Sequence, residues 1–223
     1  MGRYAQSWLP GSSAFMLSRR VILAGAVAAV PLLSRLAVAQ QADQAVLQGS
    51  SQFIQWLGEQ ALSTLRSPNV TLEQRETSFR NLMRTGFDIE FIGRFVLGRY
   101  WQQSTPEQRA DYVQLFGEYL VKTYARRLGG YSGETFTIVS ATPAGEQDVL
   151  VRTRIDRPGA PPLFCDWRVR VINSQYKIID VMVEGISMAV TQRQDFGAVV
   201  QQGGMPALLT ALRARTETVA AQR

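Results

Sequence analysis

The stretch Tyr176–Phe196, YKIIDVMVEGISMAVTQRQDF, decides the fold of this 223-residue chain because it joins a strand to a helix. The apolar run before Gly185 is typical of a strand, the glycine predicts a turn, and a helix is expected to begin near Ser187. Upstream, the stretch Phe91–Leu128 combines a tight aromatic turn with a long amphipathic helix. Strands preceded and followed by helices are therefore expected.

Apolar residues recur with the period of a helix through most of the first 130 residues. Helices are predicted over 43–65, from Thr71 onward, over 88–96 and over 105–128. Thr71 and Thr105 each precede a glutamine by three residues, which is the spacing of a capping box, and Pro106 occupies a favoured first helical position. Ser67-Pro68-Asn69 and Gly129-Gly130 are expected to end the first and the last of these helices.

After the second glycine pair the apolar period changes from 3.6 to 2. Strands are predicted over 134–142, 147–156, 163–173 and 176–184, with turns at 143–145, 157–159 and 173–174. Two helices, 187–200 and 205–215, are expected to close the chain on either side of Gly203-Gly204. Short connections between strands favour an antiparallel meander, so the predicted fold class is α+β, a four-stranded antiparallel sheet with helices packed on one face.

Alternation sorts the second and third strands onto two faces. The apolar face carries Val149, Val151, Ile155, Cys165, Trp167, Val169 and Val171. The other carries Arg152, Arg154, Asp166, Arg168 and Arg170. We expect helices to cover the apolar face and leave the other polar and cationic. The fourth strand is apolar on both sides, so either a β-bulge exchanges its faces or a helix covers its second side.

The motifs of these stretches resemble the MlaC family, also called the toluene-tolerance auxiliary or Ttg2-type family, of periplasmic phospholipid-binding proteins. The residues that carry the resemblance are Val96-Leu97-Gly98, Tyr100-Trp101, Pro106, Tyr124, Asp180-Val181, Val183-Glu184-Gly185, Ser187, Arg193 and Phe196. The resemblance extends from about Asp43 to Arg215. It implies a curved sheet of the NTF2-like kind, with helices packed around a deep apolar pocket.

By pattern alone, an apolar sheet face opposed by an aromatic helix is an ordinary core. The resemblance instead implies a pocket for acyl chains between the sheet and the helices. The residues expected to line it are Phe91, Val96, Tyr100, Phe116, Leu120, Tyr124, Val149, Val151, Trp167, Val169, Ile178, Val181 and Val183.

The resemblance also implies a function: a carrier that shuttles phospholipid between two membranes and maintains the lipid asymmetry of the outer one. The implied partners are phospholipid, an inner-membrane MlaD-like complex with its ABC transporter, and an outer-membrane MlaA-like lipoprotein. We expect a monomer that needs no cofactor, catalyses no reaction and binds no nucleic acid. Two alternatives stay open: a carrier of another lipid, such as a hopanoid or other isoprenoid, and a small NTF2-like enzyme that uses Asp180.

The N-terminus has the features of an export signal, so a periplasmic location is expected. Arg19-Arg20 precedes an apolar run that is too short to span a bilayer, and Ala37-Val38-Ala39 supplies a cleavage site before Gln40. Residues 1–39 are predicted to be removed and 40–223 to form one domain. Either Met1 or Met16 can be the start, and the arginine pair leaves both the twin-arginine and the general secretory route open.

Composition excludes several classes of protein. Cleavage would remove four of the 24 basic residues and none of the 18 acidic ones, which leaves a net charge of +2 and no electrostatic case for nucleic-acid binding. Without histidine there is no Ser-His-Asp triad and no imidazole metal site. Cys165 is the single cysteine, so no internal disulfide can form, and we expect a small buried side chain.

A few polar residues invite a functional reading beside a structural one. Asp180 is either a desolvated general base or a structural residue that holds a helix end, by accepting backbone N–H groups or by pairing with an arginine, and we favour the second role. Glu184 is expected to be a turn or capping residue and Ser187 an N-cap rather than a nucleophile. The four arginines of the polar face could be solvated or meet lipid phosphate, and Arg99 and Arg193 could contact a headgroup.

Overall fold

The computed structural model describes residues 30–66, 71–127 and 133–221, and it divides the chain into two compact units. The first unit is Met1–Ala42 and the second is Asp43–Arg223; the fold and the site below belong to the second. Residues 1–29 of the predicted export signal, the break at 67–69 and the glycine pair at 129–130 lie outside the described residues.

Helices precede and follow an antiparallel sheet, in the predicted order. The helices are α1 (Val30–Arg66), α2 (Leu72–Gly86), α3 (Ile89–Leu97), α4 (Arg99–Gln103), α5 (Pro106–Arg127) and α6 (Met188–Ala221). The strands are β1 (Thr135–Ala144), β2 (Asp148–Arg157), β3 (Ala160–Ile172), β4 (Gln175–Val183) and β5 (Ile186–Ser187). The short elements α4 and β5 were not predicted, and α1 begins at Val30 rather than at residue 43.

Two of the helix starts are set by the predicted capping boxes. Thr71 Oγ1 accepts from the Gln74 amide at 3.2 Å, and the Gln74 side chain accepts from the Thr71 amide at 2.9 Å. Thr105 and Gln108 make the same reciprocal pair at 3.2 and 3.1 Å. Because these bonds satisfy amides that a helix leaves unpaired, each cap stabilises its helix by about 1 kcal/mol.

The sheet is a meander in the order β1-β2-β3-β4-β5, antiparallel throughout. This confirms the predicted antiparallel topology and corrects the strand count from four to five, since Ile186–Ser187 pairs with the end of β4. Asn173 and Ser174 form the two-residue turn between β3 and β4, with φ of 49° and 61°. Two successive positive φ values match the right-handed twist of a tight hairpin.

Two predicted strand ends were wrong, both at prolines. β1 continues through Pro143, which pairs with Val149, whereas a turn was expected there. Since β1 is an edge strand, a proline without an N–H can be accommodated in it. β3 begins at Ala160, ahead of two prolines, rather than at residue 163. Prolines are also tolerated at the start of a strand, because the missing N–H is not needed for the hydrogen bonds of the sheet there.

A β-bulge exchanges the faces of β4, as one of the two alternatives predicted. Arg168 pairs with Asp180 and Val169 pairs with Ile178, so Ile179 is the extra residue. Before the bulge Ile178 shares a face with Val169; after it Val181 shares that face with Trp167. The bulge therefore places apolar side chains on one face of the sheet on both sides of Ile179.

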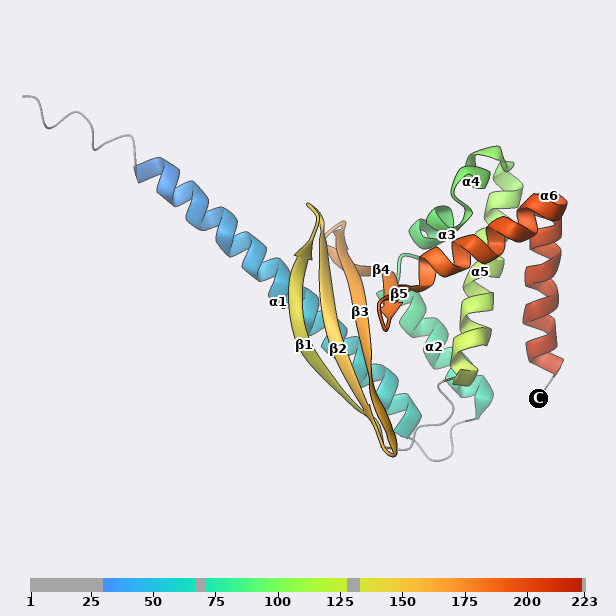
Figure 1. Ribbon diagram of the computed structural model, residues 1–223, viewed down its shortest axis with the longest axis horizontal. Helices are drawn as coiled ribbons and strands as arrows, with labels where there is room; N and C mark the ends of the chain where they lie inside the picture. Colours follow the sequence, from blue (N-terminus) through green and yellow to red (C-terminus); the bar gives the residue numbers. More distant parts are fainter. Residues whose placement is uncertain (1–29, 67–70, 128–132, 222–223) are drawn as a thin grey trace, which may run out of the picture. The chain divides into compact units, whose positions relative to one another are not determined.

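The second unit contains two hydrophobic cores. In the sheet core, residues 43–66 of α1 cross one face of the sheet (Figure 1), and Ile54 and Leu57 pack on that face. In the helical core, α3, α5 and α6 pack on one another beyond the β4 end of the sheet. The helices expected on one sheet face are therefore divided between the two cores.

The predicted glycine break divides α6 into two helical segments. Gly203 has φ −142° and ψ 16°, and Gly204 has φ 69° and ψ −174°, so the chain leaves the helical conformation at both residues. The kink returns Met205, Leu208 and Leu212 to the core that Phe196 and Val200 enter from the first segment.

Candidate functional site

The predicted lining of the pocket is distributed over both cores. The sheet core contains Val149, Val151, Trp167, Val169, Ile178 and Val181. The helical core contains Val96, Tyr100, Phe116 and Leu120. Of the other three, Tyr124 and Val183 are half-buried outside both clusters, and Phe91 is exposed. The structure thus brings six of the strand residues together and four of the helix residues together, but it does not bring the two sets into one cluster.

The sheet core is built from cross-strand pairs on one face. Val149 lies opposite Val169, and Trp167 lies opposite both Val151 and Val181. Aromatic and β-branched pairs of this kind pack well on a pleated surface. Val151 is fully buried. Because this face is apolar, an acyl chain can pack on it wherever the side chains of α1 that cover it move away.

Glycines bring α1 close to this face. A Cβ at Gly58 would lie 2.7 Å from the ring of Phe136, and a Cβ at Gly49 would lie 1.9 Å from the hydroxyl of Tyr176. Between residues 43 and 62 the side-chain hydrogen bonds of α1 stay within the helix, such as that from Ser51 to the Leu47 carbonyl. Apolar packing alone therefore holds this part of α1 on the sheet.

Polar side chains of β2 and β3 inside the sheet core have hydrogen-bond partners, whereas one buried hydroxyl of α1 has none among the described residues. The Trp167 indole donates to Thr153 Oγ1 at 2.9 Å, and the Thr153 hydroxyl donates to the Cys165 carbonyl at 3.1 Å. On α1, the hydroxyl of Ser50 is fully buried and has no hydrogen-bond partner among the described residues. An unsatisfied buried hydroxyl destabilises the contact between α1 and the sheet.

An open hollow of about 570 Å³ lies at the edge of this contact. Its lining consists of Ala45, Gln48, Gly49, Gln52, Phe53, Trp56 and Tyr176. Sequence reasoning missed all of these residues. The available signal was their spacing, because the α1 residues recur at intervals of three and four positions and so follow one side of the helix, where Trp56 is 43% exposed.

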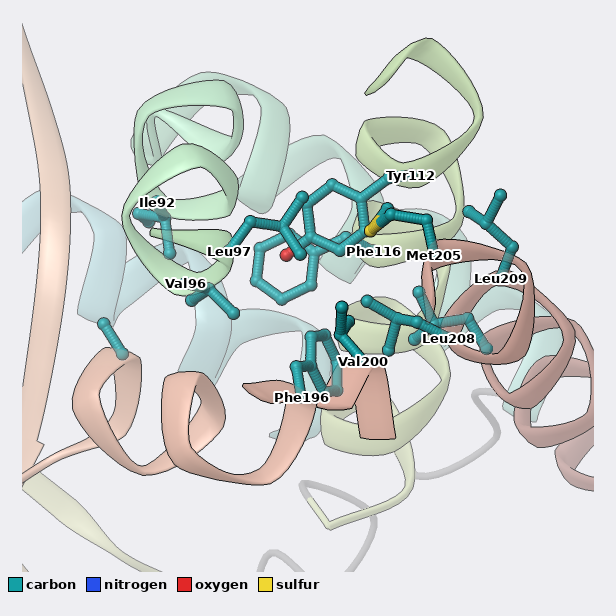
Figure 2. Close-up of a cluster of buried hydrophobic side chains, with 12 residues drawn as sticks. Ile92, Val96, Leu97, Tyr112, Phe116, Phe196, Val200, Met205, Leu208 and Leu209 are labelled. Atoms are coloured by element: carbon teal, nitrogen blue, oxygen red, sulfur yellow. The ribbon is translucent and has the colours of Figure 1, made fainter. Parts of the chain in front are cut away.

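The helical core is aromatic and closely packed (Figure 2). The rings of Tyr112 and Phe116 stack with centroids 5.6 Å apart, and Phe196 meets both edge-on at 6.3 and 6.1 Å. The Tyr112 hydroxyl donates to the Gly93 carbonyl at 3.3 Å, and burial raises the pKa of the phenol. This cluster, with Val96 beside it, has the character of an ordinary core.

Comparison with known proteins identifies the family. The sequence profile of the MlaC protein family matches residues 55–214. This chain belongs to the MlaC family. It is 23% identical over 190 residues to the intermembrane phospholipid transport system binding protein MlaC of Haemophilus influenzae, covering 82% of this chain and 86% of that protein.

A solved structure has the same fold. The phospholipid-binding protein of Ralstonia solanacearum, determined in complex with a phospholipid, matches with a TM-score of 0.70 at 23% identity. The match covers 77% of this chain and 98% of the other. The MlaC-family membership and the mixed helix and antiparallel-sheet fold predicted from the motifs are both confirmed.

In this MlaC-family chain, the motif residue Asp180 holds the start of α6. Its Oδ1 accepts from the amides of Val181 and Ala189 at 2.8 and 3.1 Å, and its Oδ2 accepts from the Ser187 hydroxyl at 2.6 Å. The predicted structural role is confirmed. Ser187 is itself the predicted N-cap, because its Oγ accepts from the Val190 amide at 3.1 Å.

The family motif Val183-Glu184-Gly185 is a turn that is fastened to β3. Glu184 and Gly185 have φ of 49° and 80°, which confirms the turn. Glu184 also accepts from the Phe164 amide at 2.8 Å through Oε1. The motif thus fixes the position at which the chain leaves the sheet for α6.

The predicted cationic face is neutralised by carboxylates. Asp148, whose side chain is 2% exposed, pairs with both Arg168 and Arg170 at 2.6 Å. Arg152 lies 3.5 Å from Asp166, and Arg154 lies 2.6 Å from Asp156. Although burial acts to raise the pKa of Asp148, the hydrogen bonds from Arg170 and Arg168 hold it below its ordinary value. The face is therefore polar, as predicted, but not a free patch of positive charge.

Arg99 and Arg193 do not line the hollow beside α1, and both lie close to aromatic rings. The Arg99 guanidinium lies 4.9 Å from the Tyr100 ring centroid and donates to its hydroxyl at 2.9 Å, which lowers the pKa of that phenol. The Arg193 guanidinium lies 5.2 Å from the ring of Phe95. Headgroup contact by these two arginines stays a prediction.

Within the ranges that the structure describes, no group of three or more acidic or cysteine side chains is arranged to hold a metal ion. Nor is any described helix long and apolar enough to cross a bilayer. Cys165 is buried as predicted, and burial raises the pKa of its thiol to about 11.

Proposed function

We propose that this protein is a periplasmic carrier of glycerophospholipid. The observation that carries the proposal is the family match over residues 55–214. The relative from Haemophilus influenzae bears the name of an intermembrane phospholipid transport binding protein, and the structure from Ralstonia solanacearum contains a phospholipid. Both support phospholipid as the ligand of this chain.

A carrier is needed because acyl chains do not cross water unaided. Each buried CH₂ is worth about 0.8 kcal/mol, so a lipid with two chains is held strongly in its bilayer. An apolar protein interior and a bilayer are both dry, and transfer of the tails between them is close to neutral. The protein can therefore load and unload lipid without catalysing a reaction and without a cofactor.

We place the acyl chains against the sheet core, between α1 and the strands. The residues that would contact them are those of the predicted lining on that side: Val149, Val151, Trp167, Val169, Ile178, Val181 and Val183. Residues 43–62 of α1 lie on this face through apolar contacts and leave the Ser50 hydroxyl unsatisfied. An acyl chain that displaces these α1 residues replaces their apolar contacts with the strands by its own, so the exchange costs little free energy.

The route we propose for the lipid joins two membrane complexes. The carrier would meet an outer-membrane MlaA-like lipoprotein and an inner-membrane MlaD-like ABC-transporter complex, and so help to maintain the asymmetry of the outer membrane. We propose residues 40–223 as the single mature domain, a monomer, after cleavage behind Ala39.

The test is native mass spectrometry of the protein purified without detergent from the periplasm of cells that express the full chain. We expect a mass that begins at Gln40 together with a stoichiometric adduct, and extraction should yield glycerophospholipid. An isoprenoid adduct would replace phospholipid by another cargo. A bare protein that also takes up no lipid from vesicles would refute the carrier.

A further inference from the structure

A serine lies in the middle of the apolar side of α1. Val46, Ile54 and Leu57 of this helix pack in the sheet core. The helical period of about 3.6 residues places Ser50 among them on the same side. Ser50 is fully buried, and its hydroxyl has no hydrogen-bond partner among the described residues. The side of α1 that faces the sheet therefore contains one polar group that the described protein does not satisfy.

The surroundings of this hydroxyl do not supply a partner. The neighbouring Ser51 donates to the Leu47 carbonyl at 3.1 Å, a bond within the helix that Ser50 does not make to its own preceding turn. On the sheet, the Thr153 hydroxyl is engaged with the Trp167 indole and the Cys165 carbonyl. A buried water would need about two to four polar partners, which an apolar face does not offer. The hydroxyl is thus available to an acceptor that a ligand brings into the sheet core.

Ser50 also lies where the sheet core borders the open hollow. The preceding residue, Gly49, lines the hollow of about 570 Å³ together with Phe53 and Tyr176. Phe53 and Tyr176 pack against the sheet core as well. The hollow and the core therefore share two of their walls, and a ligand that extends from one into the other passes Ser50.

The hollow suits the polar part of a lipid. The residues that line it are all uncharged. Gln48 and Gln52 contribute side-chain amides, and Tyr176 contributes a hydroxyl that lies over Gly49. Such groups donate to oxygen atoms of glycerol and of a headgroup whatever the net charge of the headgroup. The hollow can therefore hold the polar end of a lipid while its tail lies on the sheet.

The sheet core is about as wide as one acyl chain is long. α1 crosses the face from Tyr176 of β4, which lies over Gly49, to Phe136 of β1, which lies over Gly58 (Figure 1). The helix advances about 14 Å between these two glycines. One leaflet contributes about 15 Å to the hydrocarbon thickness of a bilayer. An acyl chain that starts beside Ser50 can thus cross the whole apolar face.

We propose that the Ser50 hydroxyl donates a hydrogen bond to an ester carbonyl of the bound glycerophospholipid and so fixes where the acyl chain enters the sheet core. The ester carbonyls are the acceptors next to the acyl chains, whereas the phosphate oxygens lie further out. The bond gives the buried hydroxyl a partner when lipid replaces the contacts between α1 and the strands. The inference rests on the proposed function and adds a selection for ester-linked lipid over lipid without a carbonyl.

The test is a competition between an ester lipid and an ether lipid of equal chain length. The mature protein, purified without detergent from the periplasm of cells that express the full chain, is incubated with vesicles of equal parts dioleoyl phosphatidylcholine and its dioleyl ether analogue. Native mass spectrometry separates the two adducts by mass. The unmodified protein should favour the ester lipid by about three- to tenfold, and Ser50→Ala should remove this preference.

The matched control is Ser51→Ala, which removes a hydroxyl of the same helix that is already bonded within the helix. This variant should keep the preference for the ester lipid. In protein from which lipid has been extracted, Ser50→Ala should unfold at a higher urea concentration than Ser51→Ala. The change in helix propensity is the same in both, and only the first variant removes a buried group without a partner.

The outcomes separate this inference from the carrier proposal. Equal uptake of both lipids by the unmodified protein would overturn the role of Ser50 and leave the carrier in place. A preference that persists in Ser50→Ala would do the same, because another group would then recognise the ester. Uptake of neither lipid would refute the carrier and this inference with it.

Discussion

The hydroxyl of Tyr176 lies over Gly49 of α1, so close that a Cβ at residue 49 would come within 1.9 Å of the phenolic oxygen. The Tyr176 ring also stacks on Phe53 of the same helix, with centroids 5.9 Å apart. The start of β4 thus lies against α1 because Tyr176 stacks on Phe53 and Gly49 has no side chain in the way. Both residues line the open hollow at the edge of the contact between α1 and the sheet.

We predict that Gly49→Ala displaces the Tyr176 ring and costs the stacking on Phe53, about 1 kcal/mol. In a Tyr176→Ala background the same change should stabilise by about 0.5–1 kcal/mol, because alanine is the better helix former. Urea unfolding of the four proteins in this double-mutant cycle measures the coupling. A coupling energy near zero would mean that the ring does not occupy the space above Gly49.

Gly197→Ala provides the matched control for a helical glycine in open surroundings. Among the described residues, no atom beyond its neighbours in the helix lies within 4 Å of a Cβ at this position on α6. We expect a gain of about 0.5–1 kcal/mol in the free energy of unfolding from helix propensity alone. The same urea titration measures this gain. A loss of stability would mean that a Cβ at residue 197 collides with other atoms.

Asp180→Ala should destabilise the protein by about 2 kcal/mol, because it removes the acceptor for two amides and one hydroxyl at the start of α6. Asp180→Asn should cost less, since its amide oxygen still accepts and its amide nitrogen can donate to Ser187. Thermal unfolding and native mass spectra of both variants test this, with lipid content expected to be unchanged. If Asp180→Asn abolished function while stability and bound lipid stayed normal, the enzymatic alternative would regain support.

Asp148→Asn should destabilise the protein by about 1–3 kcal/mol at neutral pH, because it breaks a buried pair with two partly exposed arginines. The pKa of Asp148 is held below its ordinary value in the folded state. Its stabilising contribution is therefore present above the unfolded pKa of about 3.9 and is lost as the pH falls through the lower folded pKa. The difference between the two proteins in urea unfolding should shrink towards pH 3.

The control for this pH dependence is Asp156→Asn. Asp156 forms an ion pair with Arg154 in which both side chains are about half exposed. We expect a change below about 1 kcal/mol, since exposed pairs contribute little. An equal effect at both aspartates would show that burial does not distinguish them.

Val181→Glu should reduce bound lipid by about tenfold or more while the protein stays folded. Val181 is half-buried opposite Trp167, so a carboxylate there can reach water, but an acyl chain against the sheet would then have to desolvate it. Val171→Glu, on β3, introduces the same charge on the same face of the sheet. Because this position is 41% exposed, the variant should leave the lipid in place. Lipid analysis of both variants, alongside circular dichroism, decides whether the site lies where we propose.

Local chemistry made most of the elements predictable. Thr71 and Thr105 cap their helices as their spacing with glutamine indicates, and Asn173 and Ser174 form the expected turn. These features involve residues close together in the chain, so no knowledge of packing is needed. The errors at Pro143 and before Pro161 arose because proline breaks an interior strand but is tolerated at an edge or a strand start, and edge position is a property of the whole sheet.

The sequence by itself determined the α+β pattern, the alternation that separates Val151 from Arg152, and the motifs that place the chain in the MlaC family. Only the tertiary structure decided which apolar residues meet. It placed Phe116 and Val151 in different cores, paired the polar-face arginines with carboxylates, and left Phe91 exposed. Alternation and helical period report which side of one element is apolar, whereas the partner of that side depends on long-range packing and charge pairing.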